Sequence, residues 1–340
     1  MFYLGRFASG GKVLVRRRDG KHYETNPLNV AVESGYYDVP DGTGGVSKEV
    51  EKGLAGVEGM ADAALSQIDR TLRLPDPADP VNATLALFIG LQMARTTEHR
   101  ERVLFPQRVV VWLSGREATP GLVAEYLETK HLGFRPADGE VDGAYILVRE
   151  AVTNEPRTLT EEFAVEMMLR SAIELSRRVL ALNWTLELAR QGEFITSDSP
   201  VVIWRKPSRR DEYQGIGIET AEELRLPLDP RKQLVLSRRR RSRSVMEVEP
   251  HRVSHSNEDM ADACHRFIIG TPANPGSLTS QRLERWRPTI RFNVGPLLDE
   301  GATLGRAARG EVVHVWTPRS ARVGLPKARR QPASSRSTRR

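Results

Sequence analysis

The spacing of apolar residues changes near Asn183, and this change limits the folds that the chain can adopt. Before that point apolar side chains recur every three or four residues, which is the period of an amphipathic helix. After it they alternate with polar side chains, as in Trp184, Leu186 and Leu188, which is the period of a strand with one buried face. Helices in the first half and strands in the second predict an α+β fold, with the helix-rich half packed on a mainly antiparallel sheet.

Helix-start signals divide the first half into segments. Ser47 is a candidate N-cap for a helix that ends near Leu72, and Asp79 followed by Pro80 is a typical start for a second one. A capping box at 158–161 precedes a third. The second helix is apolar on nearly every side, so we expect it to be central and buried.

Weaker signals mark three other segments. Residues 12–16 and 21–24 flank an Asp-Gly dipeptide, which predicts a hairpin. Residues 103–113 fit either a strand or a short helix. Asn257 is a candidate N-cap for a helix with one apolar face, made of Met260, Ala263, Cys264, Phe267 and Ile268.

The net charge of +7 belongs to the end of the chain. Residues 319–340 hold eight basic side chains and no acid, which leaves 43 basic and 44 acidic side chains elsewhere. A segment so rich in Ser, Pro and Arg cannot form a core, so we expect one globular domain over 1–317 and a disordered basic tail over 318–340. The tail is either a weak, salt-dependent contact for nucleic acid or an acidic surface, or a solubilising end.

Compartment and cofactor signals are sparse. One cysteine excludes an intramolecular disulfide, and no apolar run is long enough to span a membrane, so we expect a cytoplasmic protein with no membrane association. The common nucleotide, zinc and serine-hydrolase motifs are absent. Acids and histidines at 251–265 are more simply explained as the first turn of a helix than as a metal site. The sequence therefore assigns no cofactor and no metal.

Three polar side chains on the first two helices are candidate site residues. Glu58 lies on the apolar face of its helix, and Gln92 and Arg95 continue the face that Phe88 begins. A carboxylate and a guanidinium turned inward are costly unless each meets a partner. We therefore expect Glu58 and Arg95 to meet in the interior.

The segment 194–202 supplies two further candidates. Thr196 and Asp198 belong to a run of four short oxygen-bearing side chains between two apolar strands. Such residues bond the local backbone in turns. Alternatively, Asp198 projects from a strand end as a base, an acid or a cation ligand, with Thr196 and Ser197 orienting it.

Several separated pieces of the chain, in this order and at this spacing, resemble the bacterial domain-of-unknown-function family 4238 (DUF4238). The resemblance runs from residue 1 to about residue 270. The pieces are Phe2-Tyr3-Leu4-x-x-Phe7, Asn29-Val30-Ala31 with Tyr36-Tyr37, the 51–58 helix, Gln92-x-x-Arg95-Thr96, Phe194-x-Thr196-Ser197-Asp198-x-Pro200 and Pro227-Leu228-x-Pro230.

The resemblance implies no assigned activity, because the family has none. It supports Glu58, Gln92, Arg95, Thr196 and Asp198 as the polar positions to test. The family pattern has a His and a Pro just ahead of the Tyr-Leu-x-x-Phe piece, where this chain has only Met and Phe. Either the start codon lies upstream or this member lacks that histidine, and if the histidine is catalytic in the family, the chain as written is expected to be inactive.

Two function hypotheses follow. The first is a hydrolase of phosphoester or similar bonds, with Asp198 and Glu58 as acid–base or metal-binding carboxylates and Arg95 stabilising negative charge. The second is a non-catalytic binding or regulatory protein, in which the same residues form a structural network and Arg-rich segments contact nucleic acid or a protein partner.

Overall fold

The computed structural model describes residues 2–30, 39–40, 46–153, 161–206, 216–238, 244–284, 289–296 and 311–316, and it has the predicted α+β fold. Most of its helices precede residue 181. The helices are α1 (Phe2–Gly5), α2 (Glu49–Thr71), α3 (Pro80–Ala94), α4 (Thr97–Leu113), α5 (Pro120–Tyr126), α6 (Asp138–Thr153), α7 (Glu161–Leu180), α9 (Pro250–Ala263) and α10 (Gly276–Thr279), with short turns η1 (Pro27–Asn29) and η2 (Leu127–Leu132).

Two larger sheets and two strand pairs make up the described β-structure. The four-stranded sheet is antiparallel, in the order β2 (His22–Thr25), β1 (Val13–Arg17), β11 (Phe267–Gly270), β6 (Thr196–Ser197). The five-stranded sheet has the order β10 (Ser244–Val248), β5 (Asn183–Ala189), β9 (Lys232–Ser237), β8 (Glu223–Asp229), β7 (Val202–Trp204), and only its β10–β5 pair is parallel. The strand pairs are β3 (Val39–Pro40) with β4 (Val46–Ser47) and β12 (Arg291–Pro296) with β13 (Glu311–Trp316).

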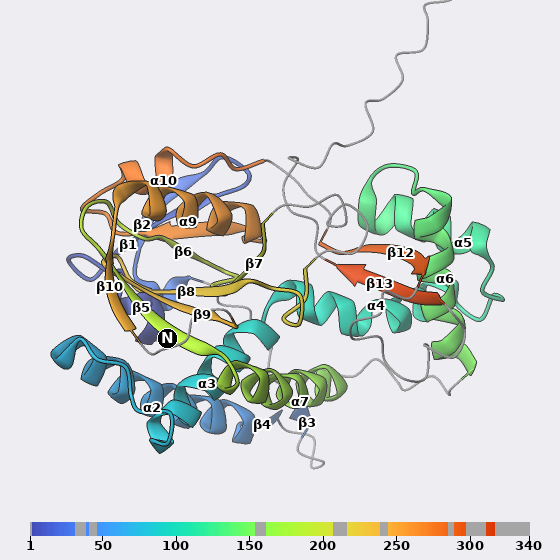
Figure 1. Cartoon of the computed structure of the whole chain (residues 1–340). Coiled ribbons are helices and arrows are strands. Elements are labelled where there is room, and N and C mark those ends of the chain that lie inside the picture. Colours follow the sequence, from blue (N-terminus) through green and yellow to red (C-terminus); the bar gives the residue numbers. More distant parts are fainter. Residues whose placement is uncertain are drawn as a thin grey trace, which may run out of the picture.

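The sheets lie between two helical layers (Figure 1). Helices α2, α3 and α7 cover one face, where Leu65, Phe88 and Trp184 belong to the largest apolar cluster. Helix α9 covers the other face, where Met260 and Cys264 pack with residues of β1 and β11. Because side chains alternate between the two faces of a strand, the strands supply apolar side chains to the contacts with both helical layers.

A separate apolar cluster lies around the second half of α4, with α5, α6 and the β12–β13 pair, at the right of Figure 1. Phe105, Leu132 and Phe292 are buried in it, and Arg291 holds Glu140 in an ion pair. Because α4 begins beside the sheets and ends in this cluster, it joins the two parts. A single domain over 1–317 and a disordered tail over 318–340 stay predictions, since the tail lies outside the described residues.

Helix α3 is central and buried, as predicted, and it contacts α7 closely. Gly90 lies at the closest approach, where an added Cβ would lie 2.3 Å from the carbonyl oxygen of Ala172 and 3.1 Å from the backbone nitrogen of Ser176. A side chain of any size at Gly90 would therefore force the two helices apart.

Some sequence-based element predictions are confirmed and others are wrong. The hairpin and the Asp79 cap are found, and residues 103–113 are helical, within a longer helix that Thr96 caps. The N-cap position of α2 is Lys48, which makes no side-chain cap bond, but Ser47 Oγ one residue earlier accepts from the Glu49 nitrogen at 3.3 Å. The capping box at 158–161 lies mostly outside the described residues. Asn257 caps nothing, because α9 begins at Pro250 and the chain is a strand by residue 267.

Asn257 instead holds the link that leads to β6. Its Oδ1 accepts a hydrogen bond from the Ile195 nitrogen at 3.0 Å, and its Nδ2 donates to the Glu193 carbonyl at 2.8 Å. Asn257 therefore makes a tertiary contact from the middle of α9, and the local sequence pattern does not predict that contact. Among the described residues, no helix is both long and apolar enough to cross a membrane.

Candidate functional site

Glu58 of α2 and Arg95 at the end of α3 meet, as their positions on the two helix faces predict. Arg95 Nη1 lies 2.6 Å from Glu58 Oε1, and both side chains are half-buried. Arg95 Nε also donates to Gln92 Oε1 at 3.2 Å, one turn back along α3. Three of the five predicted residues therefore form one bonded group, here called the Glu58–Arg95–Gln92 cluster.

The charge of Glu58 is stabilised in this cluster. Burial acts to raise its pKa, but the positive charges that face it, that of Arg95 first among them, lower it by more. The net effect is a pKa below the usual value for a glutamate. Glu58 is therefore a carboxylate at neutral pH, able to accept a proton or coordinate a cation.

Gln92 brings a hydrogen-bond donor into the cluster. Its side chain is 2% exposed, and within the part of the chain that the structure describes its Nε2 has no hydrogen-bond partner. A buried amide without an acceptor costs free energy, on the order of 1–3 kcal/mol. Such a group is a candidate for contact with a ligand oxygen.

Thr196 lies beside the cluster, through Tyr3. The Tyr3 hydroxyl donates to the Pro227 carbonyl at 2.7 Å and lies 2.7 Å from Thr196 Oγ1. Because the carbonyl can only accept, the Thr196 hydroxyl must donate to Tyr3. Burial raises the pKa of Tyr3 well above its usual value, and the charge of Arg95 acts on the same hydroxyl in the opposite direction. Tyr3 is thus a neutral phenol that joins Thr196 to the Pro227 carbonyl, near enough to Arg95 for its charge to act on the hydroxyl.

The carboxylate of Asp198 accepts hydrogen bonds from backbone amides. Its Oδ1 accepts from the His265 nitrogen at 2.8 Å, and its Oδ2 accepts from the Arg266 nitrogen at 2.6 Å. These bonds fix the turn between α9 and β11. The local turn interpretation is found at Ser197, whose Oγ accepts from the Ser199 nitrogen at 3.0 Å, whereas Asp198 bonds a turn 67 residues away and its catalytic role stays a prediction.

The segment around Asp198 lies on the same side of the molecule as Arg95. Ser199 Oγ donates to Glu98 Oε2 at 2.9 Å, and both residues are buried. Glu98 lies in the first turn of α4, three residues after Arg95. The link between the two segments is thus made by Ser199 and Glu98, while the hydrogen bonds described for Asp198 go to the α9–β11 turn.

His99, in the same first turn of α4, was not among the predicted residues. Burial, with the charge of Arg102 second, lowers its pKa to about 4. The only sequence signal for it is its place just after the Gln92-x-x-Arg95-Thr96 piece, and that signal is weak.

We predict that His99 makes folding stability depend on pH between its two pKa values. Its pKa is about 4 when folded and roughly 6.5 when unfolded, so the unfolded chain binds a proton first as the pH falls. Stability should be constant near pH 7 and decrease from about pH 6.5 to pH 4. Urea unfolding at several pH values measures the free energy of unfolding. If that free energy falls between pH 6.5 and pH 4 as steeply in His99→Gln as in the unaltered protein, the prediction is wrong.

A polar network under α9 was also missed. Glu187, which is 1% exposed, holds Arg252 through both oxygens at 3.0 Å and accepts from Gln233 at 3.1 Å. Arg225 bonds Glu223 at 2.7 Å and Asp259 at 2.6 Å. The alternation of β5 marks Glu187 as a residue on the polar face, but only the position of α9 shows that this face is covered.

The side chains that could bind a metal are dispersed in the described part of the chain. No group of three or more His, Cys, Asp and Glu side chains there could hold a metal ion. His251, His255 and Asp259 lie along α9, with Asp259 bonded to Arg225.

The fold and the cluster together define an α+β protein whose first helices and central sheet enclose a half-buried ion pair with a buried amide beside it. The chain belongs to the family described as protein of unknown function (DUF4238), whose model matches residues 1–274. This confirms the resemblance, with nearly the boundary that the sequence pieces indicate. No curated protein and no solved structure matches the chain.

Proposed function

We propose that the protein is a hydrolase of phosphoester or similar bonds, with the Glu58–Arg95–Gln92 cluster as its reactive site. The observation that carries this proposal is the buried Gln92 amide, which has no acceptor among the described residues and lies beside a carboxylate and a guanidinium. An anionic substrate oxygen would provide the acceptor that Nε2 lacks.

Each cluster residue has a role in this proposal. Glu58 is the general base, because it is the ionised carboxylate beside Arg95; its lowered pKa makes it a weak base, so its position and not its basicity would supply the rate. Arg95 stabilises the negative charge that develops as water attacks, and Gln92 donates to the same oxygen. Thr196 and Tyr3 act as positioning residues on the sheet side. Asp198 positions the backbone at residues 265–266 and is assigned no proton transfer.

We predict that Glu58→Gln lowers hydrolysis of bis(4-nitrophenyl) phosphate or 4-nitrophenyl phosphate by at least about 100-fold in kcat, since a positioned general base contributes 10²–10⁴. The melting temperature should change little, because the ion pair is only half-buried. Glu51→Gln, an exposed change on the same helix, is the matched control. The proposal is contradicted if Glu58→Gln hydrolyses a substrate as fast as the unaltered protein does. It is also contradicted if the unaltered protein hydrolyses neither substrate.

A non-catalytic binding or regulatory protein is the second candidate, and the contacts of Asp198 favour it. An asparagine there keeps one acceptor oxygen but turns an NH₂ group toward a backbone N–H, so Asp198→Asn should cost about 1–3 kcal/mol of stability. Under this alternative, Glu58→Gln changes stability and no activity. The Arg-rich tail proposed to contact nucleic acid lies outside the described residues.

A further inference from the structure

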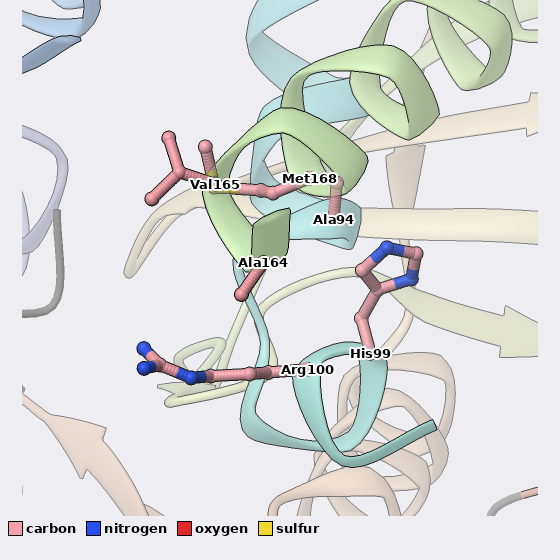
Figure 2. Close-up of a pocket in the computed structure, with 6 residues that line it drawn as sticks. All are labelled: Ala94, His99, Arg100, Ala164, Val165 and Met168. Atoms are coloured by element: carbon pink, nitrogen blue, oxygen red, sulfur yellow. The ribbon is translucent and has the colours of Figure 1, made fainter. Parts of the chain in front are cut away.

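The hollow drawn in Figure 2, between the end of α3 and the first turns of α4 and α7, is too small to hold a ligand. It has room for about one water molecule, about 10 Å³. The His99 ring and the Arg100 side chain, which both line it, point in different directions and do not converge on a common group. This hollow is therefore excluded as a binding site, and the surface offers a better one.

Strand β10 forms an open edge of the five-stranded sheet, at the left of Figure 1. It pairs with β5 on one side, and it is the last strand of this sheet among the described residues. The Arg190 nitrogen donates to the Val248 carbonyl at 3.2 Å, so the backbone groups of Val248 face β5. Because backbone groups point alternately to the two sides of a strand, those of Val245 and Glu247 point to the open edge. They can bond another strand.

The side chains of β10 do little to keep another strand away. Val245 is 41% exposed and Met246 is 42% exposed, although both are apolar. Unpaired edges in proteins are commonly protected by lysine, proline or a bulge. Strand β10 has no lysine and no proline, its register with β5 is regular, and Glu247 is its one charged side chain. Its edge is therefore suited to strand addition.

The charges around β10 are complementary to those of a second copy of the strand. Glu247 and Glu249 are exposed, and both pair with the exposed Arg190. The sequence just before the strand has the opposite sign, with four arginines at positions 239, 240, 241 and 243. These arginines lie outside the described residues and enter the argument through the sequence alone. In an antiparallel pair the start of each strand lies beside the end of the other, so arginines of one copy are matched with glutamates of the other.

We propose that β10 is a dimer interface, in which it pairs antiparallel with β10 of a second copy of this chain. The fully overlapped register places Val245 opposite Glu247 of the second copy, so that the outward backbone groups of both residues bond. Met246 then lies opposite Met246 of the second copy, in a non-hydrogen-bonded pair with Cα atoms about 4.5 Å apart. The interface is independent of the proposed hydrolase activity, because β10 contributes no residue to the Glu58–Arg95–Gln92 cluster.

Cross-linking of Met246→Cys tests the proposed register. A disulfide needs Cα atoms about 4.4–6.8 Å apart, and the Met246 pair meets this condition. With oxidised glutathione as the oxidant, the full chain with Met246→Cys should form a cross-linked dimer at least about tenfold faster than Tyr23→Cys. Tyr23 is the matched control, because it is 41% exposed and lies on β2, which is also an edge strand. The buried Cys264 is present in both variants.

Sedimentation equilibrium of the unaltered full chain measures the dimer without a cross-link. Val245→Pro removes a backbone donor that points away from β5, so it should weaken dimerisation at least about tenfold and leave the fold intact. If the proline variant does not fold, Val245→Lys places a charge at the same edge and should have the same effect. High salt should also weaken the dimer, because it screens the exposed charges.

Three results would overturn the proposal. One is an unaltered chain that is monomeric at every concentration measured. Another is cross-linking of Tyr23→Cys as fast as that of Met246→Cys, which would mean that contact is not specific to β10. The third is a dimer that the Val245 variants leave as stable as the unaltered one, which would place the interface elsewhere.

Discussion

Replacing Gly90 with alanine is expected to lower the free energy of unfolding by about 3 kcal/mol, the upper end of what overpacking typically costs. The added Cβ would lie 2.3 Å from the Ala172 carbonyl oxygen, which is backbone and cannot move aside as a side-chain end can. Helices α3 and α7 would have to separate, and the apolar contacts between them would loosen. Urea unfolding followed by circular dichroism measures the change.

Gly59→Ala is the matched control for that experiment. Gly59 lies inside α2, and an added Cβ there has no atom within 4 Å. Alanine should stabilise this helix by roughly 0.5–1 kcal/mol, because it loses less backbone entropy on folding than glycine. If Gly90→Ala lowers the free energy of unfolding and Gly59→Ala raises it, the loss at Gly90 comes from the packing of the helices. A loss of stability below about 1 kcal/mol in Gly90→Ala would contradict the close approach.

Arg225→Met should destabilise the fold by about 3–5 kcal/mol, the cost of removing one partner from a buried ion pair. Arg225 is 2% exposed, bonds Glu223 and Asp259, and lies over the ring of Trp204 at 4.4 Å. Removing it takes a cation from two carboxylates that the sheet and α9 enclose. The measurement is again the free energy of unfolding in urea at pH 7.

The pH dependence of Arg225→Met separates lost charge from lost packing. Burial raises the pKa of Glu223, but Arg225 and Arg252 lower it by more, so its folded pKa lies below the unfolded one. The stabilisation is therefore present above the unfolded pKa and is lost as the pH falls through the folded one. The cost of Arg225→Met should shrink below about pH 4.5, where carboxylates gain protons.

Arg190→Met is the surface counterpart of this substitution. Arg190 is 59% exposed and pairs with Glu247 and Glu249, which are exposed as well. Exposed ion pairs contribute about 0–1 kcal/mol, so this variant should be close to neutral. Equal effects of Arg190→Met and Arg225→Met would show that burial does not determine the strength of the network.

The sequence predicts features that depend on local period and fails where a contact spans the chain. Glu58 and Arg95 are found because each lies on the inner face of a helix, and a buried charge needs a partner. The α+β class follows from the change of period near Asn183. The Tyr3–Thr196 bond joins residues 193 positions apart, and no local pattern encodes it.

The network under α9 was missed for a related reason. Glu187 alternates with apolar neighbours along β5, a pattern that is the same whether the polar face meets water or another layer. Only the position of α9 shows that the polar face of β5 meets another layer and not water. Asn257 was mistaken for a cap because its residue type favours helix starts, whereas its side chain here serves the link to β6.

The pairing of β1 with β11 bears on how the protein is made. Val13–Arg17 pairs with His22–Thr25 along one edge and finds the partner of its other edge in Phe267–Gly270, and Arg18 next to it donates to the carbonyls of Ala261, Cys264 and His265. The hairpin that leaves the ribosome first therefore has one edge of β1 unpaired, and apolar Leu14 uncovered, until some 250 further residues are synthesised. During that interval the open edge of β1 can pair with another chain, which is the hazard of any unpaired edge strand.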